Sequence, residues 1–185
     1  MKLIILFSIL TYITLNNKND IIYYDYMDEQ IIDSVSRFES DYEEFESLNY
    51  YDGEYKEEII KKINKNLKYK LKDKGDFIVT YSLEKGVDPY LVTGIIIHET
   101  GCSWGCSNLV KKCNNVAGNK GKPSCNGGSY RKFNSIEDGI KFSINVISSY
   151  YKNGYNTPKL MNKKYASDKK WHVKVEKYIN KIKNS

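Results

Sequence analysis

The chain has 185 residues, a length that fits one domain with additional segments. Apolar residues make up 41% of it, which is enough to bury a packed core. Its net charge of +6 favours an anionic partner, but no helix-turn-helix, zinc-knuckle or RNA-recognition signature accompanies that charge, so nucleic acid is not the expected partner.

The first predicted segment is residues 1–20. Lys2 precedes thirteen uncharged and mostly apolar residues, 3–15, which is the layout of a secretory signal and is too short for a standard membrane helix. No small-x-small cleavage site follows. We interpret the segment as a signal peptide or an uncleaved anchor, with membrane contact through residues 3–15. A buried amphiphilic segment is the alternative. The protein is therefore expected to be secreted or associated with the cell envelope.

An acidic segment follows. Residues 21–58 hold thirteen acidic and two basic residues, a net charge of −11, whereas residues 59–185 carry +16. Apolar residues recur at steps of three and four between positions 24 and 45, which predicts a helix. This helix either docks on the basic part of the chain or a partner, or acts as a solvated spacer. We group residues 21–66 as an acidic helical segment with a connecting helix; the amphipathic pattern of that helix extends over residues 54–72.

A short buried helix is predicted further along the chain. An earlier helix is expected to start at Asp76 and to end at Gly86. Asp88 is then a good N-cap, Pro89 fits the first helical position, and Gly101 can end the helix in a left-handed conformation. The residues between are apolar on more than one face, so this helix is expected inside a domain.

Glu99 stands in the last turn of that helix. Val92, Ile95 and Ile96 share its helix face, so the carboxyl group is expected in apolar surroundings, which disfavour its charged form. A carboxylic acid that keeps its proton is what a general acid for glycoside cleavage requires. The alternative is an inert glutamate at a helix end, partly exposed to solvent.

Residues 101–135 read as a long structured loop, with a short hairpin around residues 126–133 as an option. It contains all four cysteines, Cys102, Cys106, Cys113 and Cys125. Because the start of the chain points to export, two disulfides are the first interpretation, and three pairings are open. Zinc bound by His98 and cysteines is the rival, but the spacings match no familiar zinc pattern. We predict no metal and no cofactor.

The remainder reads as helices. Ser135 and Asp138 form a capping box, a shorter helix starts near Thr157, and a last helix is expected after Ser167. No stretch alternates as a long strand. The predicted fold class is therefore mainly α.

Five motifs in order carry a family resemblance. They are E-T-G from Glu99, W-G-x-S from Trp104, N-N-x-x-G from Asn114, a phenylalanine with S-x-E-x-G-I from Phe133, and Y-A…W…V from Tyr165. Together they resemble the glucosaminidase superfamily of bacterial cell-wall hydrolases, a lysozyme-like group. The resemblance covers residues 67–185 and implies a lysozyme-like helical domain there, with a long cysteine-bearing loop.

The resemblance also implies roles for individual residues. Glu99 falls on the catalytic acid, and Tyr165 on a tyrosine close to that acid. The amides of the asparagine pair suit N-acetyl and hydroxyl groups, and aromatic rings suit sugar stacking, although core packing explains an aromatic residue equally well. The implied substrate-binding positions are Thr100, Trp104, Asn114, Asn115, Gly118 and Tyr130, with Phe133 as a further sugar-stacking candidate.

The expected activity is hydrolysis of peptidoglycan glycan strands at the β-1,4 bond after N-acetylglucosamine, on an anionic cell wall. A two-carboxylate mechanism needs a second acid, yet no Asp or Glu lies between Glu99 and Glu137. Help from the substrate's N-acetyl group, a water held by Tyr165 and the asparagines, or a lytic transglycosylase reaction would resolve this. A muramidase, or a non-catalytic wall-binding module of a phage or secretion apparatus, would also fit the sequence.

Overall fold

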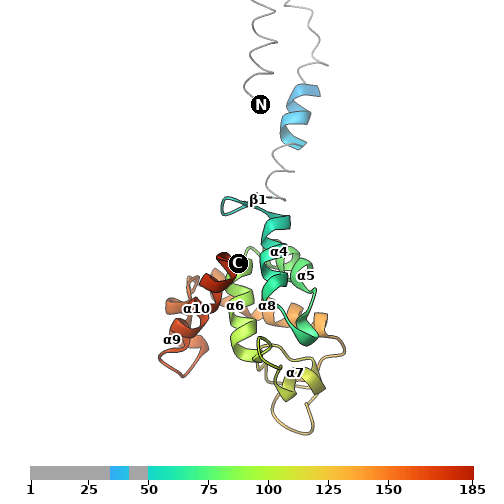
Figure 1. The fold of residues 1–185 in the computed structure, drawn as a ribbon, viewed down its shortest axis with the longest axis vertical. Helices are drawn as coiled ribbons and strands as arrows, with labels where there is room; N and C mark the ends of the chain where they lie inside the picture. Colours follow the sequence, from blue (N-terminus) through green and yellow to red (C-terminus); the bar gives the residue numbers. More distant parts are fainter. Residues whose placement is uncertain (1–33, 42–49) are drawn as a thin grey trace, which may run out of the picture. The chain divides into compact units, whose positions relative to one another are not determined.

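The structure, a computed structural model, describes residues 34–41 and 50–185 (Figure 1). The predictions for residues 1–20, and for 21–66 except 34–41 and 50–66, lie outside the described residues. Residues 34–41 form a helix. Within the described residues, every helix is too short or too polar to span a bilayer.

A compact unit comprises residues 51–185. At its start lies a tight hairpin in which β1 (Tyr50–Tyr51) pairs with β2 (Glu54–Tyr55). Its two turn residues, Asp52 and Gly53, both have positive φ, as the favoured two-residue hairpin turn requires.

Helix α4 (Lys56–Asn66) buries Ile59 and Ile63 in the main core. The predicted continuation of this helix to residue 72 is wrong. Leu67 is extended, and a 3-10 turn, η1 (Tyr69–Leu71), follows. Leu67 and Leu71 are both buried, so the break in the helix lets both side chains reach the core.

Helix α5 (Gly75–Glu84) begins one residue before the predicted cap, Asp76. Its first N–H, at Gly75, donates a 2.8 Å hydrogen bond to Oδ1 of Asn64 on α4. A Cβ at position 75 would lie 2.6 Å from that oxygen, so the contact depends on glycine. A side chain from the preceding helix therefore replaces the local cap that the sequence predicted.

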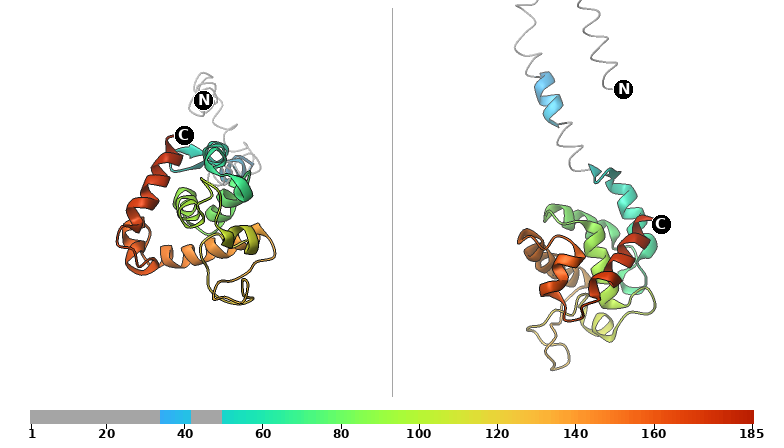
Figure 2. Two further views of the ribbon diagram at one scale, coloured as in Figure 1. Left: turned by 60° about the horizontal axis from the view of Figure 1, so that its bottom comes forward. Right: turned by 90° about the vertical axis from the view of Figure 1, so that its left-hand side faces the viewer.

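The central helix α6 (Pro89–Thr100) has the predicted bounds. The Asp88 side chain accepts from Tyr90 N at 2.8 Å, and Gly101 ends the helix with φ of 62°. Helices α5 and α10 pack directly against it, and Figure 2 shows α6 enclosed by the other helices. Ten of its residues are buried, as expected from its apolar composition.

Four further helices complete the domain: α7 (Asn108–Cys113), α8 (Ile136–Lys152), α9 (Pro158–Tyr165) and α10 (Trp171–Lys183). The structure is mainly helical with one short two-stranded sheet, so the predicted fold class is confirmed.

The caps of these helices agree only partly with the prediction. Ser135 and Asp138 form the predicted capping box of α8, and Thr157 caps α9. Helix α10 starts four residues after Ser167, because Asp168 closes a turn by accepting N–H groups of Lys170 and Trp171. Trp171 is therefore the first residue of α10.

Candidate active site

Glu99 lies in the last turn of α6 and is partly buried. The indole Nε1 of Trp171 donates a hydrogen bond to its Oε1 at 2.9 Å. Trp171 is only 2% exposed, so this donor is held firmly in the core. One carboxylate oxygen is therefore anchored, while the residue still reaches the surface.

A close approach of two helices places this tryptophan. A Cβ at Gly94 would lie 2.7 Å from Cγ1 of Ile179 and 3.3 Å from the carbonyl oxygen of Val175. Only glycine allows α6 and α10 to pack at this separation. The two helices run in opposite directions here, so the residues beyond Gly94 on α6 meet the start of α10. Trp171 reaches Glu99 for this reason.

Tyr165 ends α9 beside the same group. Its ring centroid is 5.0 Å from that of Trp171 and 5.5 Å from that of Tyr150, which it meets edge to face. Burial raises the pKa of the Tyr165 hydroxyl, and the nearby Glu99 carboxylate raises it further. Tyr165 therefore remains a neutral hydroxyl, which can both donate and accept hydrogen bonds close to the acid.

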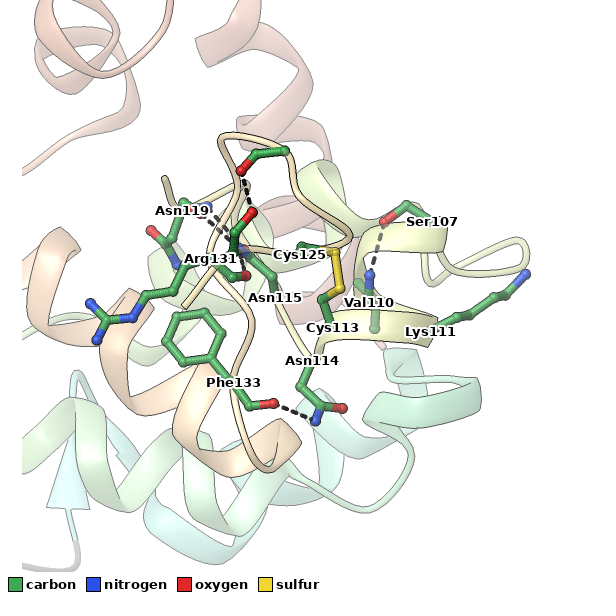
Figure 3. The surroundings of a disulfide bond; sticks show 12 residues. Ser107, Val110, Lys111, Cys113, Asn114, Asn115, Asn119, Cys125, Arg131 and Phe133 are labelled. Atoms are coloured by element: carbon green, nitrogen blue, oxygen red, sulfur yellow. Dashed lines mark hydrogen bonds between the residues drawn. A yellow bond between two sulfur atoms is a disulfide. The ribbon is translucent and has the colours of Figure 1, made fainter. Parts of the chain in front are cut away.

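The loop after Glu99 is held by two disulfides. Cys102 pairs with Cys106. Cys113 pairs with Cys125, the disulfide drawn in Figure 3. All four sulfur atoms are thus bonded in pairs, so they are not available as zinc thiolates. The first disulfide closes the turn that immediately follows Gly101.

Thr100 supports that turn. Its buried hydroxyl donates to Ile96 O at 2.6 Å and accepts from Cys102 N at 3.1 Å. Its carbonyl accepts from Ser107 N at 2.8 Å. These bonds fix the chain directly after Glu99.

The asparagine pair ties together two arms of the loop (Figure 3). Asn114 ends α7 in a left-handed conformation and donates to Phe133 O at 3.0 Å. Asn115 is buried, and its Nδ2 donates to Asn119 O at 2.7 Å and to Arg131 O at 2.8 Å. Its Oδ1 accepts from Asn119 N, so the whole Asn115 amide is used inside the loop.

The same arms carry two antiparallel bridges, between positions 120 and 130 and between 124 and 131. Tyr130 stands on one arm, is 43% exposed, and has its ring next to Gly118. Phe133 is buried against Phe142, with ring centroids 5.3 Å apart. Trp104 lies elsewhere, with 83% of its surface exposed. Of the predicted residues, the structure thus brings Tyr165 to Glu99 and places Asn115, Gly118 and Tyr130 in the disulfide-held loop.

Three of the four side-chain carboxylates that follow Glu99 in the chain are engaged elsewhere. Glu137 pairs with Lys74 at 2.6 Å, and that hydrogen bond lowers the pKa of its carboxyl group. Asp138 accepts the Ser135 N–H in the capping box of α8. Asp168 pairs with Lys174 at 2.7 Å.

Comparison with known proteins identifies the family of the chain. Residues 75–184, more than half of the chain, match the glucosaminidase family model, described as mannosyl-glycoprotein endo-beta-N-acetylglucosaminidase. The chain belongs to the glucosaminidase family. No curated protein matches the sequence. Membership supports glycoside hydrolase activity on a glycan, and the two disulfides are consistent with an extracellular or envelope location.

The matched part of this glucosaminidase runs from α5 to α10 and so contains Glu99, Tyr165 and Trp171. No site role was predicted for Trp171 from the sequence. Its position in the Y-A…W…V motif was the available signal. The hydrogen bond to Glu99 becomes visible only when α6 and α10 are packed together.

Proposed function

We propose that this glucosaminidase cleaves the glycan strands of bacterial peptidoglycan at the β-1,4 bond after N-acetylglucosamine, with Glu99 as general acid. The observation that carries the proposal is the anchored carboxyl group of Glu99, which Trp171 holds at the end of a buried helix beside Tyr165. The disulfides support action outside the cytoplasm, on the anionic wall.

The indole N–H defines the roles of the two carboxyl oxygens. An indole N–H only donates, so Oε1 of Glu99 must accept. The acidic proton then belongs on Oε2. In the proposed reaction Oε2–H donates this proton to the glycosidic oxygen while the bond from that oxygen to the anomeric carbon breaks. The leaving sugar departs as an alcohol, and positive charge develops at the anomeric carbon.

The second half of the reaction needs a group that stabilises this charge. Glu137, Asp138 and Asp168 are occupied by their own partners, so none is proposed for this role. We assign it to the carbonyl oxygen of the substrate's N-acetyl group. The Tyr165 hydroxyl would orient the water that then attacks, and Glu99, now a carboxylate, would take the proton from that water.

A lytic transglycosylase reaction is the second candidate, because it also needs only one carboxyl group. Purified peptidoglycan, incubated with the protein and analysed by mass spectrometry, distinguishes the candidates. We expect new reducing ends of N-acetylglucosamine. Anhydro-muramyl ends would show a transglycosylase, and reducing muramyl ends a muramidase. Release of no sugar would leave a non-catalytic wall-binding module and overturn the proposal.

A further inference from the structure

A cavity of about 880 Å³ opens near the end of α6, and lysines surround it. Lys68 precedes η1, whereas Lys174, Lys177 and Lys181 all lie on α10. Among the described residues that line the cavity, none is acidic. We call this feature the lysine cavity.

Most of its charge has no counterion in the fold. Lys174 pairs with Asp168, but in the described ranges no ion pair involves Lys68, Lys177 or Lys181. Like charges around a concave surface repel one another and create a local positive potential. An anion in the cavity would relieve that repulsion, so the arrangement favours an anionic ligand.

The spacing of the lysines on α10 indicates that the ligand carries more than one anionic group. Residues 174, 177 and 181 follow one another at steps of three and four, and so lie on one helix face. At the rise of an α-helix, Lys174 and Lys181 are about 10 Å apart along the axis. One small anion does not span that length, whereas a chain with anionic groups in series does. Lysines bind phosphate groups as point charges.

Other groups in the cavity suit such a chain. Trp104 borders it with an exposed ring, and the Tyr69 hydroxyl donates to Trp104 O at 2.7 Å, which fixes this part of the backbone. Ser103 also lines the cavity, and its buried hydroxyl has no hydrogen-bond partner among the described residues. An apolar ring and an unused hydroxyl fit the carbon skeleton and an oxygen of a polyol.

The lysine cavity is distinct from the catalytic group but adjacent to it. Neither Glu99 nor Tyr165 lines it, whereas His98 does. The His98 ring centroid is 6.3 Å from that of Trp171, the residue that holds Glu99. A ligand in the cavity would therefore lie beside the glycan that is being cut.

We propose that the lysine cavity binds a linear phosphodiester polymer of a small polyol and so retains the enzyme on the wall. The choice of polymer rests on the proposed function, because the wall is where this enzyme would meet phosphate chains. A narrow, flexible chain enters a cavity, whereas the stiff backbone of a nucleic-acid duplex does not.

The test measures binding without cleavage. The full chain carrying Glu99→Gln is titrated with purified poly(glycerol phosphate), and Kd is followed over a range of salt concentrations. Adding Lys177→Gln and Lys181→Gln should weaken binding about tenfold, and should reduce the slope of log K against log salt by about 1.4. The matched control is Lys61→Gln with Lys65→Gln on α4, exposed lysines that do not line the cavity. It makes the same change in net charge and should leave Kd unchanged.

Charge-preserving Lys177→Arg and Lys181→Arg should restore most of the binding. Equal losses in the cavity and control variants would show attraction by net charge alone and overturn the proposal. Tighter binding of a single-stranded oligonucleotide of equal charge would also overturn it. The two proposals fail separately: no sugar release by the unaltered protein refutes the proposed function, whereas this binding measurement requires no cleavage.

Discussion

The contact between Glu99 and Trp171 joins residues 72 positions apart in the chain. Glu99 could be selected as the candidate acid from the sequence because its signal is local: a capped, apolar helix with one carboxyl group in its last turn. The pairing with Trp171 could not be predicted in this way, because it depends on how closely α6 and α10 approach at Gly94. Periodicity describes one helix at a time and cannot give the distance between two helices.

Glu99→Gln should abolish cleavage and keep the fold. The amide has the same size, and its oxygen can still accept the indole N–H, but it cannot donate a proton as an acid does. We expect a loss of roughly 10²–10⁴-fold, the range for general acid–base catalysis, measured on purified peptidoglycan. Circular dichroism controls for folding. Retention of more than about a tenth of the activity would remove Glu99 from its role.

Trp171→Phe should lower kcat about tenfold while KM changes little, because one hydrogen bond that positions the acid is lost while an aromatic ring remains. In a Glu99→Gln background the same substitution should cost almost nothing further, since the acid that it positions is already gone. Equal losses in both backgrounds would assign Trp171 a purely structural role. Thermal unfolding of each variant controls for loss of packing.

Tyr165→Phe should reduce activity by less than Glu99→Gln does. The ring contacts with Trp171 and Tyr150 remain, so stability should change little, while the hydroxyl near the carboxylate is lost. The single-turnover rate on peptidoglycan is the measurement. Tyr81→Phe is the matched control, because it removes a hydroxyl that bonds Asn145 on α8 rather than one beside Glu99. If both variants keep the full rate, the Tyr165 hydroxyl takes no part in the reaction.

At the scale of elements, the sequence predicted those boundaries that local chemistry sets. The bounds of α6 and the capping box of α8 follow from residues within three positions of a helix end. The end of α4 and the start of α5 depend instead on the burial of Leu67 and on the side chain of Asn64. These are tertiary contacts, and the helical pattern across residues 54–72 cannot predict them.

The two disulfides should differ in their effect on stability. Cys113–Cys125 spans 12 positions and Cys102–Cys106 spans 4, so the longer loop loses more entropy on closure. Replacing the cysteines of each pair with alanine should reduce the free energy of unfolding by about 3 kcal/mol and about 2 kcal/mol respectively. Urea unfolding followed by circular dichroism measures both values, and the reverse order would contradict the loop-entropy argument.

Without the Cys113–Cys125 disulfide, activity and helical structure should be lost at different temperatures. That disulfide holds the loop in which Asn115 joins the arms, so on heating the loop should loosen while the helical core remains. Activity should therefore fall at a lower temperature than the helical circular dichroism signal. Coincident midpoints would show that the loop and the helices unfold as one unit.

At the scale of the molecule, the question is where the independently folding domain begins. The sequence resemblance predicts residue 67, and the family match begins at residue 75. The core, however, includes Ile59 and Ile63 from α4, both fully buried, and Glu54 accepts the Tyr90 hydroxyl of α6 at 2.7 Å. These contacts give α4 and the hairpin a part in the fold that family motifs do not reveal.

We therefore expect residues 51–185 to fold as a unit and to cleave peptidoglycan, and residues 67–185 to be severely destabilised. Burial of one isoleucine side chain contributes about 1.5–3 kcal/mol, so removing Ile59 and Ile63 should cost at least about 3 kcal/mol. Urea unfolding of the two shortened chains measures the difference. In residues 51–185, Ile63→Ala should lose about 2–5 kcal/mol, whereas Lys61→Ala, at an exposed position of the same helix, should lose almost none. Equal stability of the two shortened chains would instead place the start of the domain at residue 67.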